Sequence, residues 1–127
     1  MKKIIATALF LLVGACSAVQ VATTPVDTVS LQKAAFAARA TYVGLLEVAV
    51  NVTDMPRCER APAPCVYQAT VNKIRSVQKT AGDATKQADE LARNPGTSPT
   101  VLSVSVDAAT RAVTVFKSTV ESNEGRK

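Results

Sequence analysis

Histidine and tryptophan are absent from this 127-residue sequence, and glycine is scarce, with five residues. Without histidine the commonest general base is missing, and Ser-His-Asp and Cys-His catalytic arrangements are impossible. The glycines form neither a G-x-G-x-x-G nor a G-x-x-x-x-G-K pattern, so no phosphate-binding loop is predicted. No pair of carboxylates is spaced to face each other across a cleft, as a glycosidase requires. We therefore predict a protein that is not an enzyme, with no catalytic residues and no cofactor.

Signals for nucleic acid and metal are also missing. The net charge is +5, but no cluster of lysine and arginine with interleaved aromatic residues occurs. Cys58 and Cys65 alone, without any histidine, do not complete a zinc site. The sequence thus predicts no metal site and no nucleic-acid partner, and it identifies no small-molecule substrate.

The amino-terminal segment has the features of an export signal. Lys2 and Lys3 precede an apolar run from Ile4 to Val13 of about ten residues, which is the length of a signal h-region and too short to span a bilayer. Two small residues then lead directly into Cys16. We expect the chain to be exported and its leader to be removed.

The stretch Leu12-Val13-Gly14-Ala15-Cys16 resembles the lipobox of bacterial lipoproteins. The resemblance implies that residues 1–15 are a signal peptide, that signal peptidase II cuts before Cys16, and that this cysteine carries acyl chains such as palmitate. Several acyl chains hold a protein stably on a membrane. Ser17, in place of an aspartate, implies sorting to the outer membrane, with the protein facing the periplasm. The alternative is an ordinary secretory signal that is cut near Ala18.

The mature chain fits one small domain. Removal of the first 15 of 127 residues leaves 112, and the loss of Lys2 and Lys3 lowers the net charge from +5 to about +3. No segment after the leader is expected to be long and apolar enough to cross a membrane. Residues 16–27 contain Pro25 and no apolar repeat, so we interpret them as a flexible tether.

The cysteines support this interpretation by their number. If Cys16 is acylated, Cys58 and Cys65 remain as a pair in an oxidising compartment. A disulfide between them closes a loop that contains two prolines, and on the chain-entropy model it stabilises the fold by about 2.5 kcal/mol. A redox motif has a tighter C-x-x-C spacing. We predict a structural disulfide.

Apolar residues at alternating steps of four and three predict two long helices. The first runs from a cap at Thr28 or Ser30 to about Asp54 and ends before Pro56, and the second extends from Tyr67 to Leu91. Both tyrosines on these seams are expected to pack in the core. The first seam consists of Leu31, Ala35, Ala38, Tyr42, Leu45, Ala49 and Val52, and the second of Tyr67, Val71, Ile74, Val77, Ala81, Ala84, Ala88 and Leu91.

Other positions on these two helices are expected at the surface. The pairs Lys79–Asp83, Lys86–Glu90 and Asp89–Arg93 are spaced i,i+4 and predict a solvated face on the second helix. On the first helix, four residues widen the apolar face and offer a surface for self-association unless a third helix covers it. These four are Phe36, Val43, Leu46 and Val50.

The segment after Ser98-Pro99 permits two interpretations. Its start is typical of a helix N-cap followed by a first-turn proline, and its apolar residues again step by four and three. Residues 101–106 and 111–116 also alternate as two strands of a β-hairpin would. The helix is favoured because a lone hairpin has nothing to pair with. The helical seam is Leu102, Val106, Ala109, Val113, Phe116 and Val120.

The predicted fold is therefore all-α, a small antiparallel three-helix bundle over residues 28–121 with a frayed tail at 122–127. We expect the tether and the Cys58–Cys65 loop at opposite ends. The expected function is that of a lipid-anchored spacer, adaptor or interaction module, whose partner is an envelope protein or a second copy. The alternative is a soluble periplasmic binding or inhibitor domain that uses the 57–65 loop, with Arg57 and Arg60 as recognition residues, because a stiff loop costs little entropy on binding.

Overall fold

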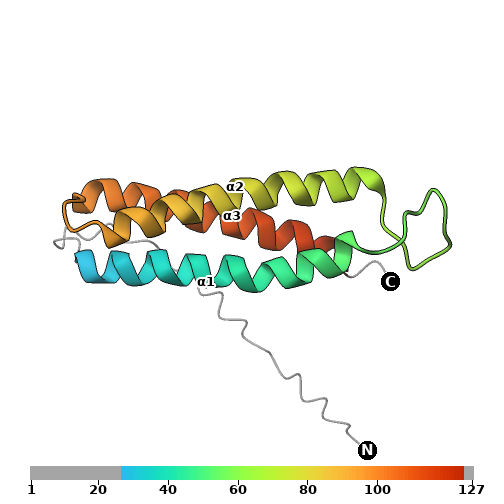
Figure 1. Ribbon diagram of the computed structural model, residues 1–127, viewed down its shortest axis with the longest axis horizontal. Helices are drawn as coiled ribbons and strands as arrows, with labels where there is room; N and C mark the ends of the chain where they lie inside the picture. The colour runs from blue at the N-terminus through green and yellow to red at the C-terminus, as the bar shows by residue number, and fades with distance from the viewer. Residues whose placement is uncertain (1–26, 125–127) are drawn as a thin grey trace, which may run out of the picture.

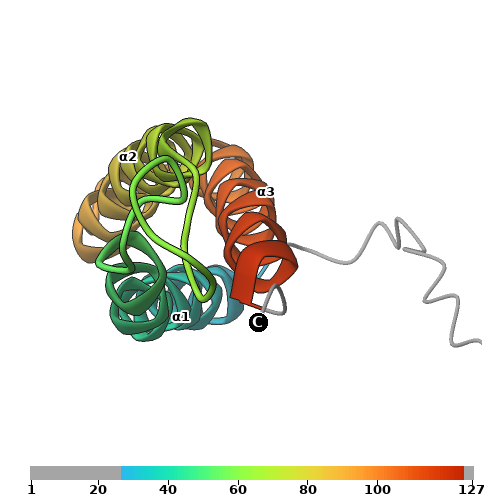
Figure 2. The ribbon, with the colours of Figure 1, turned by 90° about the vertical axis from the view of Figure 1, so that its right-hand side faces the viewer.

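The computed structural model describes residues 27–124 and shows three helices of 26 residues each. They are α1 (Thr28–Thr53), α2 (Gln68–Arg93) and α3 (Pro99–Glu124), which run up, down and up beside one another (Figures 1 and 2). Each helix contacts the other two. The all-α antiparallel bundle is confirmed. The alternative β-hairpin is wrong, because residues 101–116 lie inside α3. The predictions for the leader, Cys16 and residues 17–26 lie outside the described residues.

The helix starts differ slightly from those predicted. Asp27, which we had placed in the tether, is the N-cap of α1: its carboxylate accepts hydrogen bonds from the Val29 amide at 3.1 Å and the Ser30 hydroxyl at 2.9 Å. A carboxylate suits this position because it also interacts favourably with the helix dipole. The predicted cap at Ser98 is confirmed, since its hydroxyl accepts from the Val101 amide at 3.3 Å.

Two further predictions about helix ends were wrong. Tyr67 is 58% exposed, because it precedes the first turn of α2 and so lies outside the helical seam; Val66 enters the core beside it. α3 continues to Glu124, three residues beyond the predicted domain boundary. Within this last turn the Ser122 hydroxyl and the Asn123 side-chain amide both donate to the Thr119 carbonyl, at 3.1 and 2.6 Å.

The core changes in character along the bundle. Near the start of α1 it consists largely of small side chains, whereas toward the α1–α2 loop it holds the large ones. Small side chains let helices approach closely, so the two ends of the bundle are packed by different kinds of residue. The small-residue cluster is Ala35, Ala38, Ala88, Ala92, Leu102, Val106 and Ala109; the large-residue cluster includes Tyr42, Val52, Val66, Ile74, Phe116 and Val120.

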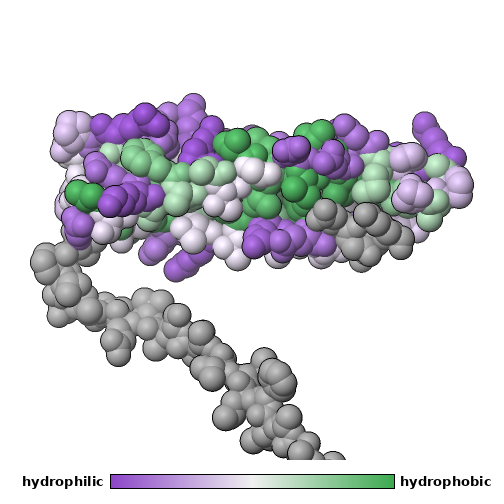
Figure 3. All heavy atoms as spheres, turned by 90° about the horizontal axis from the view of Figure 1, so that it is seen from below, coloured by the Kyte–Doolittle hydropathy of each residue, from purple (hydrophilic) through white to green (hydrophobic). Residues whose placement is uncertain are grey.

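α1 is apolar over much of its length. By length and composition α1 is long and apolar enough to cross a membrane, which corrects our expectation that no such segment follows the leader. Its many alanines and valines outweigh its few charges. Only 28% of its most apolar 18-residue window is buried in the bundle. The face of the molecule on which α1 lies accordingly carries an apolar band between hydrophilic margins (Figure 3).

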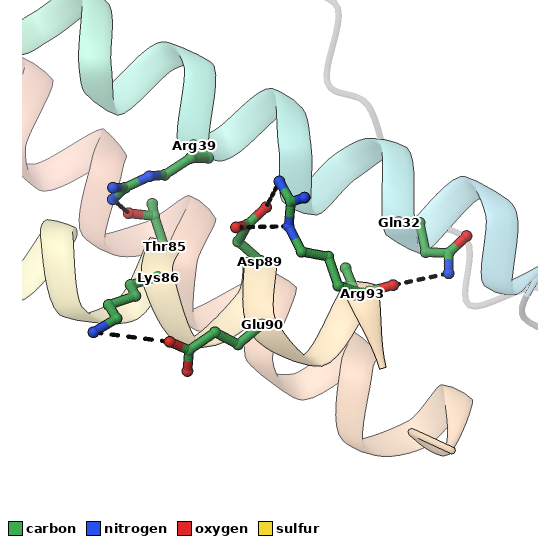
Figure 4. Close-up of polar contacts among 8 residues, drawn as sticks. Gln32, Arg39, Thr85, Lys86, Asp89, Glu90 and Arg93 are labelled. Carbon is green, nitrogen blue, oxygen red and sulfur yellow. Dashed lines mark hydrogen bonds and ion pairs between the residues drawn. The ribbon is translucent and has the colours of Figure 1, made fainter. Parts of the chain in front are cut away.

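Polar contacts fix α1 against α2 (Figure 4). The Gln32 side chain donates to the Ala92 carbonyl at 2.9 Å, and the Arg39 guanidinium donates to the hydroxyl of the fully buried Thr85 at 3.3 Å. That hydroxyl is within 2.8 Å of the Ala81 carbonyl, to which it donates. Because Arg39 and Gln32 must face α2, these bonds set the rotation of α1 about its own axis.

The glycine at position 82 makes room for a tyrosine. A Cβ atom at Gly82 would lie 2.7 Å from the Tyr42 hydroxyl oxygen, closer than van der Waals contact allows. The Tyr42 ring also packs against the Phe116 ring, with centroids 5.8 Å apart, and lies 5.4 Å from the Arg39 guanidinium. Gly82 therefore serves packing between α1 and α2.

Replacement of Phe116 by alanine tests the packing of α3. Phe116 is fully buried, so Phe116→Ala is expected to lower the free energy of unfolding by about 3–5 kcal/mol. Val104→Ala, at a position that is 66% exposed on the same helix, should change it by less than about 0.5 kcal/mol. Urea denaturation followed by circular dichroism measures both. Equal losses would contradict the placement of Phe116 in the core.

The two glycines inside helices should respond oppositely to alanine. Gly44→Ala is expected to raise the free energy of unfolding by up to about 1 kcal/mol, because nothing lies within 4 Å of the added methyl and alanine favours helix. Gly82→Ala should lower it, because the methyl meets the Tyr42 hydroxyl. Tyr42→Phe should restore part of that loss in the double variant. Thermal unfolding of the four proteins provides the comparison, and no rescue by Tyr42→Phe would refute the steric explanation.

Candidate functional site

The predicted interaction loop joins α1 to α2 and projects from the end of the bundle opposite the start of α1 (Figures 1 and 2). The Cys58–Cys65 disulfide is confirmed, with Cα atoms 4.9 Å apart, inside the usual range for such bonds. The loop and the start of α1 lie at opposite ends of the bundle; the predicted position of the tether lies outside the described residues and stays a prediction. Among the described residues, the loop reaches farthest beyond the helices at that end (Figure 1).

The base of the loop is held by backbone hydrogen bonds. The Cys58 amide donates to the Val66 carbonyl at 3.2 Å, and the Val66 amide donates to the Pro56 carbonyl at 2.8 Å, which forms a short parallel bridge. The Val66 side chain is buried in the large-residue cluster. The loop is therefore constrained by a covalent bond, a bridge and a buried anchor.

Arg57, one of the two predicted recognition residues, is engaged within the fold. One terminal nitrogen of its guanidinium donates to the Thr53 carbonyl at 3.0 Å and to the Met55 carbonyl at 2.7 Å. Its Nε donates to the Gln68 side chain at 2.9 Å. Because Thr53 ends α1 and Gln68 begins α2, Arg57 ties the two helix ends together. Its use by a partner stays a prediction.

Arg60 lies at the outer turn of the loop and is exposed. Its amide donates to the Arg57 carbonyl at 2.9 Å, which shapes the turn. Within residues 27–124 its guanidinium has no hydrogen bond or ion pair with another side chain. Of the two arginines, Arg60 is therefore the one whose charge is available at the surface.

A small hollow of about 180 Å³ opens beside the disulfide. It is smaller than the pockets that bind cofactors or drug-sized ligands, so it fits a single side chain of a partner. The exposed Tyr67 contributes to its wall, although the sequence analysis had assigned this residue to the core. The lining residues are Met55, Cys58, Ala63, Cys65, Val66, Tyr67, Thr70 and Asn123.

The charged pairs of α2 lie along its surface and not on this loop. The predicted pairs on α2 are confirmed: Lys79–Asp83 at 2.6 Å, Lys86–Glu90 at 3.8 Å and Arg93–Asp89 at 3.0 Å, the last two visible in Figure 4. The hydrogen bond and the charge of Asp83 raise the pKa of Lys79 above its ordinary value, and Asp89 does the same to the pKa of Arg93. Both pairs lie on the surface of α2, although the Asp89 carboxylate is partly buried. Within the described part of the chain, no three of the side chains that bind metals cluster together.

The two loop arginines should differ when each is replaced by glutamine. Arg57→Gln is expected to lower the free energy of unfolding by about 1–3 kcal/mol, because buried or half-buried carbonyls at the end of α1 lose a charged donor. Arg60→Gln should leave it within about 0.5 kcal/mol of the unmodified protein. Chemical denaturation under oxidising conditions measures both variants. Similar losses in the two would contradict the distinction between a structural and an available arginine.

Comparison with known proteins gives no relative to guide the functional assignment. No protein-family model matches the chain, and neither a curated protein nor a solved structure matches it significantly. The chain is therefore assigned to no family, and a proposal for its function depends on its own sequence and geometry.

Proposed function

We propose that this protein is a non-enzymatic lipoprotein of the bacterial envelope that presents the Cys58–Cys65 loop to another envelope protein. The observation that carries the proposal is the position of the loop at the end of the bundle remote from the start of α1. A helix of 26 residues is about 39 Å long, so an anchor that precedes α1 and a contact site on the loop are separated by that length.

The anchor is proposed from sequence. The stretch Leu12-Val13-Gly14-Ala15-Cys16 supports acylation of Cys16, and Ser17 supports an outer-membrane location that faces the periplasm. The 12 residues from Cys16 to Asp27 are enough to connect the lipid to the cap of α1. In this arrangement the bundle acts as a spacer or adaptor.

The loop suits recognition for two reasons. It is already ordered by its disulfide, the buried Val66 and the contacts of Arg57, so little conformational entropy is lost when a partner binds. It also exposes Arg60 and Tyr67, residue types that often dominate binding energy in interfaces. We infer a partner with an acidic group for Arg60 and an apolar side chain for the adjacent hollow.

The mass of the mature protein tests the anchor. We expect protein extracted from membranes to begin at Cys16 with acyl mass on that residue, and Cys16→Ser protein to lack it and to leave the membrane fraction. Intact mass spectrometry before and after reduction also counts the disulfide. An unmodified chain that begins after Ala18 would refute the anchor and would support the alternative of a soluble periplasmic binding domain.

Site-specific photo-cross-linking in cells tests the loop. A photoreactive residue in place of Arg60 or Ala63 is expected to cross-link to an envelope protein. The matched control is Thr100, which is exposed at the opposite end of the bundle, near the start of α3. Cross-linking from Thr100 but from neither loop position would show that the partner contacts the other end.

A further inference from the structure

An apolar stripe runs along the outside of α1. Four large apolar residues recur every seven positions and stay exposed: Val29 (53%), Phe36 (41%), Val43 (53%) and Val50 (51%). Leu46, which we had grouped with them, is instead partly buried against the core. α3 does not cover the other three members of the predicted group. Together with the exposed residues interleaved at steps of four and three, these positions form the outer stripe: Val29, Lys33, Phe36, Ala40, Val43, Glu47, Val50 and Asp54.

The outer stripe has the spacing of a coiled-coil seam, with apolar residues at one of the two core positions and Lys33, Ala40, Glu47 and Asp54 at the other. Alternating steps of four and three over nearly four heptads are the repeat that brings two helices together along their length. The bundle uses a different face of α1, since Arg39 and Gln32 point to α2 and Tyr42 is buried. The same helix therefore has one seam inside the bundle and a second outside it.

We propose that a second copy of this chain covers the outer stripe, with the two α1 helices antiparallel and related by a two-fold axis near Ala40. The charges decide the direction. Lys33 lies seven residues before Ala40 and Glu47 seven residues after it, so an antiparallel pair brings each Lys33 toward Glu47 of the other copy. A parallel pair would place like charges together, which is unfavourable. A two-fold axis forms each contact twice.

Neither charge is used within the bundle. Among the described residues, Lys33 and Glu47 form no ion pair, whereas the charged pairs on α2 and α3 are closed at i,i+4. The stripe also carries Asp54, so its acidic half fits poorly against an anionic lipid surface. A second copy of the chain supplies the complementary charge that such a surface lacks.

The shape of the stripe is also self-complementary. Phe36 lies four residues before Ala40, and Gly44 lies four residues after it. Gly44 is exposed and has no side chain, so the surface of α1 is low there, and the proposed axis places Phe36 of the second copy across from it. The Arg93 guanidinium lies over the Phe36 ring, 5.3 Å from its centre, and helps to fix the orientation of the ring. Ala40 at the crossing point allows close approach of the helices.

Charge exchange tests the proposal. The protein is the mature chain from residue 16 with Cys16→Ser, which carries neither the apolar leader nor acyl chains, and its molar mass is measured by sedimentation equilibrium at micromolar to submillimolar concentration. We expect a dimer. Lys33→Glu and Glu47→Lys should each raise the dissociation constant at least tenfold, and the double variant should recover most of the affinity. Lys73→Glu, at an exposed lysine of α2, is the matched control and should leave the dimer unchanged.

Several outcomes would overturn the proposal. These are a monomer at every concentration, the same effect from Lys33→Glu and Lys73→Glu, or no recovery in the double variant. Vesicles of phosphatidylglycerol and phosphatidylethanolamine test whether lipid covers the stripe instead. If the protein is a monomer that binds these vesicles, and Phe36→Ser abolishes the binding, lipid is the occupant and the dimer is refuted. The dimer is measured without acyl chains and without a loop partner. Absence of a dimer therefore does not contradict the proposed function of the loop, and absence of a loop partner does not contradict the dimer.

Discussion

The rotation of α1 about its own axis decides what the molecule presents to its surroundings. The hydrogen bond from Arg39 to buried Thr85 and the insertion of Tyr42 beside Gly82 both require one orientation of this helix. With that orientation fixed, Val43 and Phe36 point outward. Because the outer stripe lies on the side of α1 opposite the buried residues, only a large rotation of the helix would bury it and expose the alanines of the seam instead. The contact between α1 and α2 therefore determines which residues of α1 are exposed in the outer stripe. Arg39 and Thr85, which form this contact, are not themselves part of the stripe.

The loop depends on the same contact in a different way. Its base stands on the half of the core with the larger side chains, where Val52, Val66 and Val120 are buried together. Arg57 bridges the end of α1 and the start of α2, so the spacing of these two helices sets the width of the loop base. The disulfide then constrains only the outer part. Helix packing therefore orders the base of the loop, and the disulfide orders its outer part.

The sequence predicted the helices well because apolar period and turn residues act locally. The steps of four and three, the cap at Ser98 and the i,i+4 pairs are each decided within a few residues. Periodicity alone placed Tyr67 on the seam of the second helix. Because α2 begins one residue later, the Tyr67 side chain lines the hollow instead.

Other features depend on contacts between distant residues and carry no local signal. Thr85 is a polar residue in a buried position; its hydroxyl donates to the Ala81 carbonyl one turn earlier, and it also accepts from Arg39, 46 residues away, which no local pattern predicts. Gly82 resembles a tolerated helix glycine until the Tyr42 hydroxyl is placed against it. Likewise, Arg57 and Arg60 look equivalent in the sequence. Only the structure shows that Arg57 donates hydrogen bonds to backbone carbonyls at and just after the end of α1.

The two proposals together constrain how the protein would lie on a membrane. In an antiparallel pair the first residues of the two α1 helices lie at opposite ends, about 39 Å apart, which is the length of one helix. If both tethers enter the same membrane, the pair must lie along its surface with the two-fold axis perpendicular to it. One loop then faces outward at each end. A single copy on one tether can instead stand away from the membrane with its loop outermost. Pairing through the outer stripe would therefore convert a spacer into an adaptor that holds two contact loops at a fixed separation.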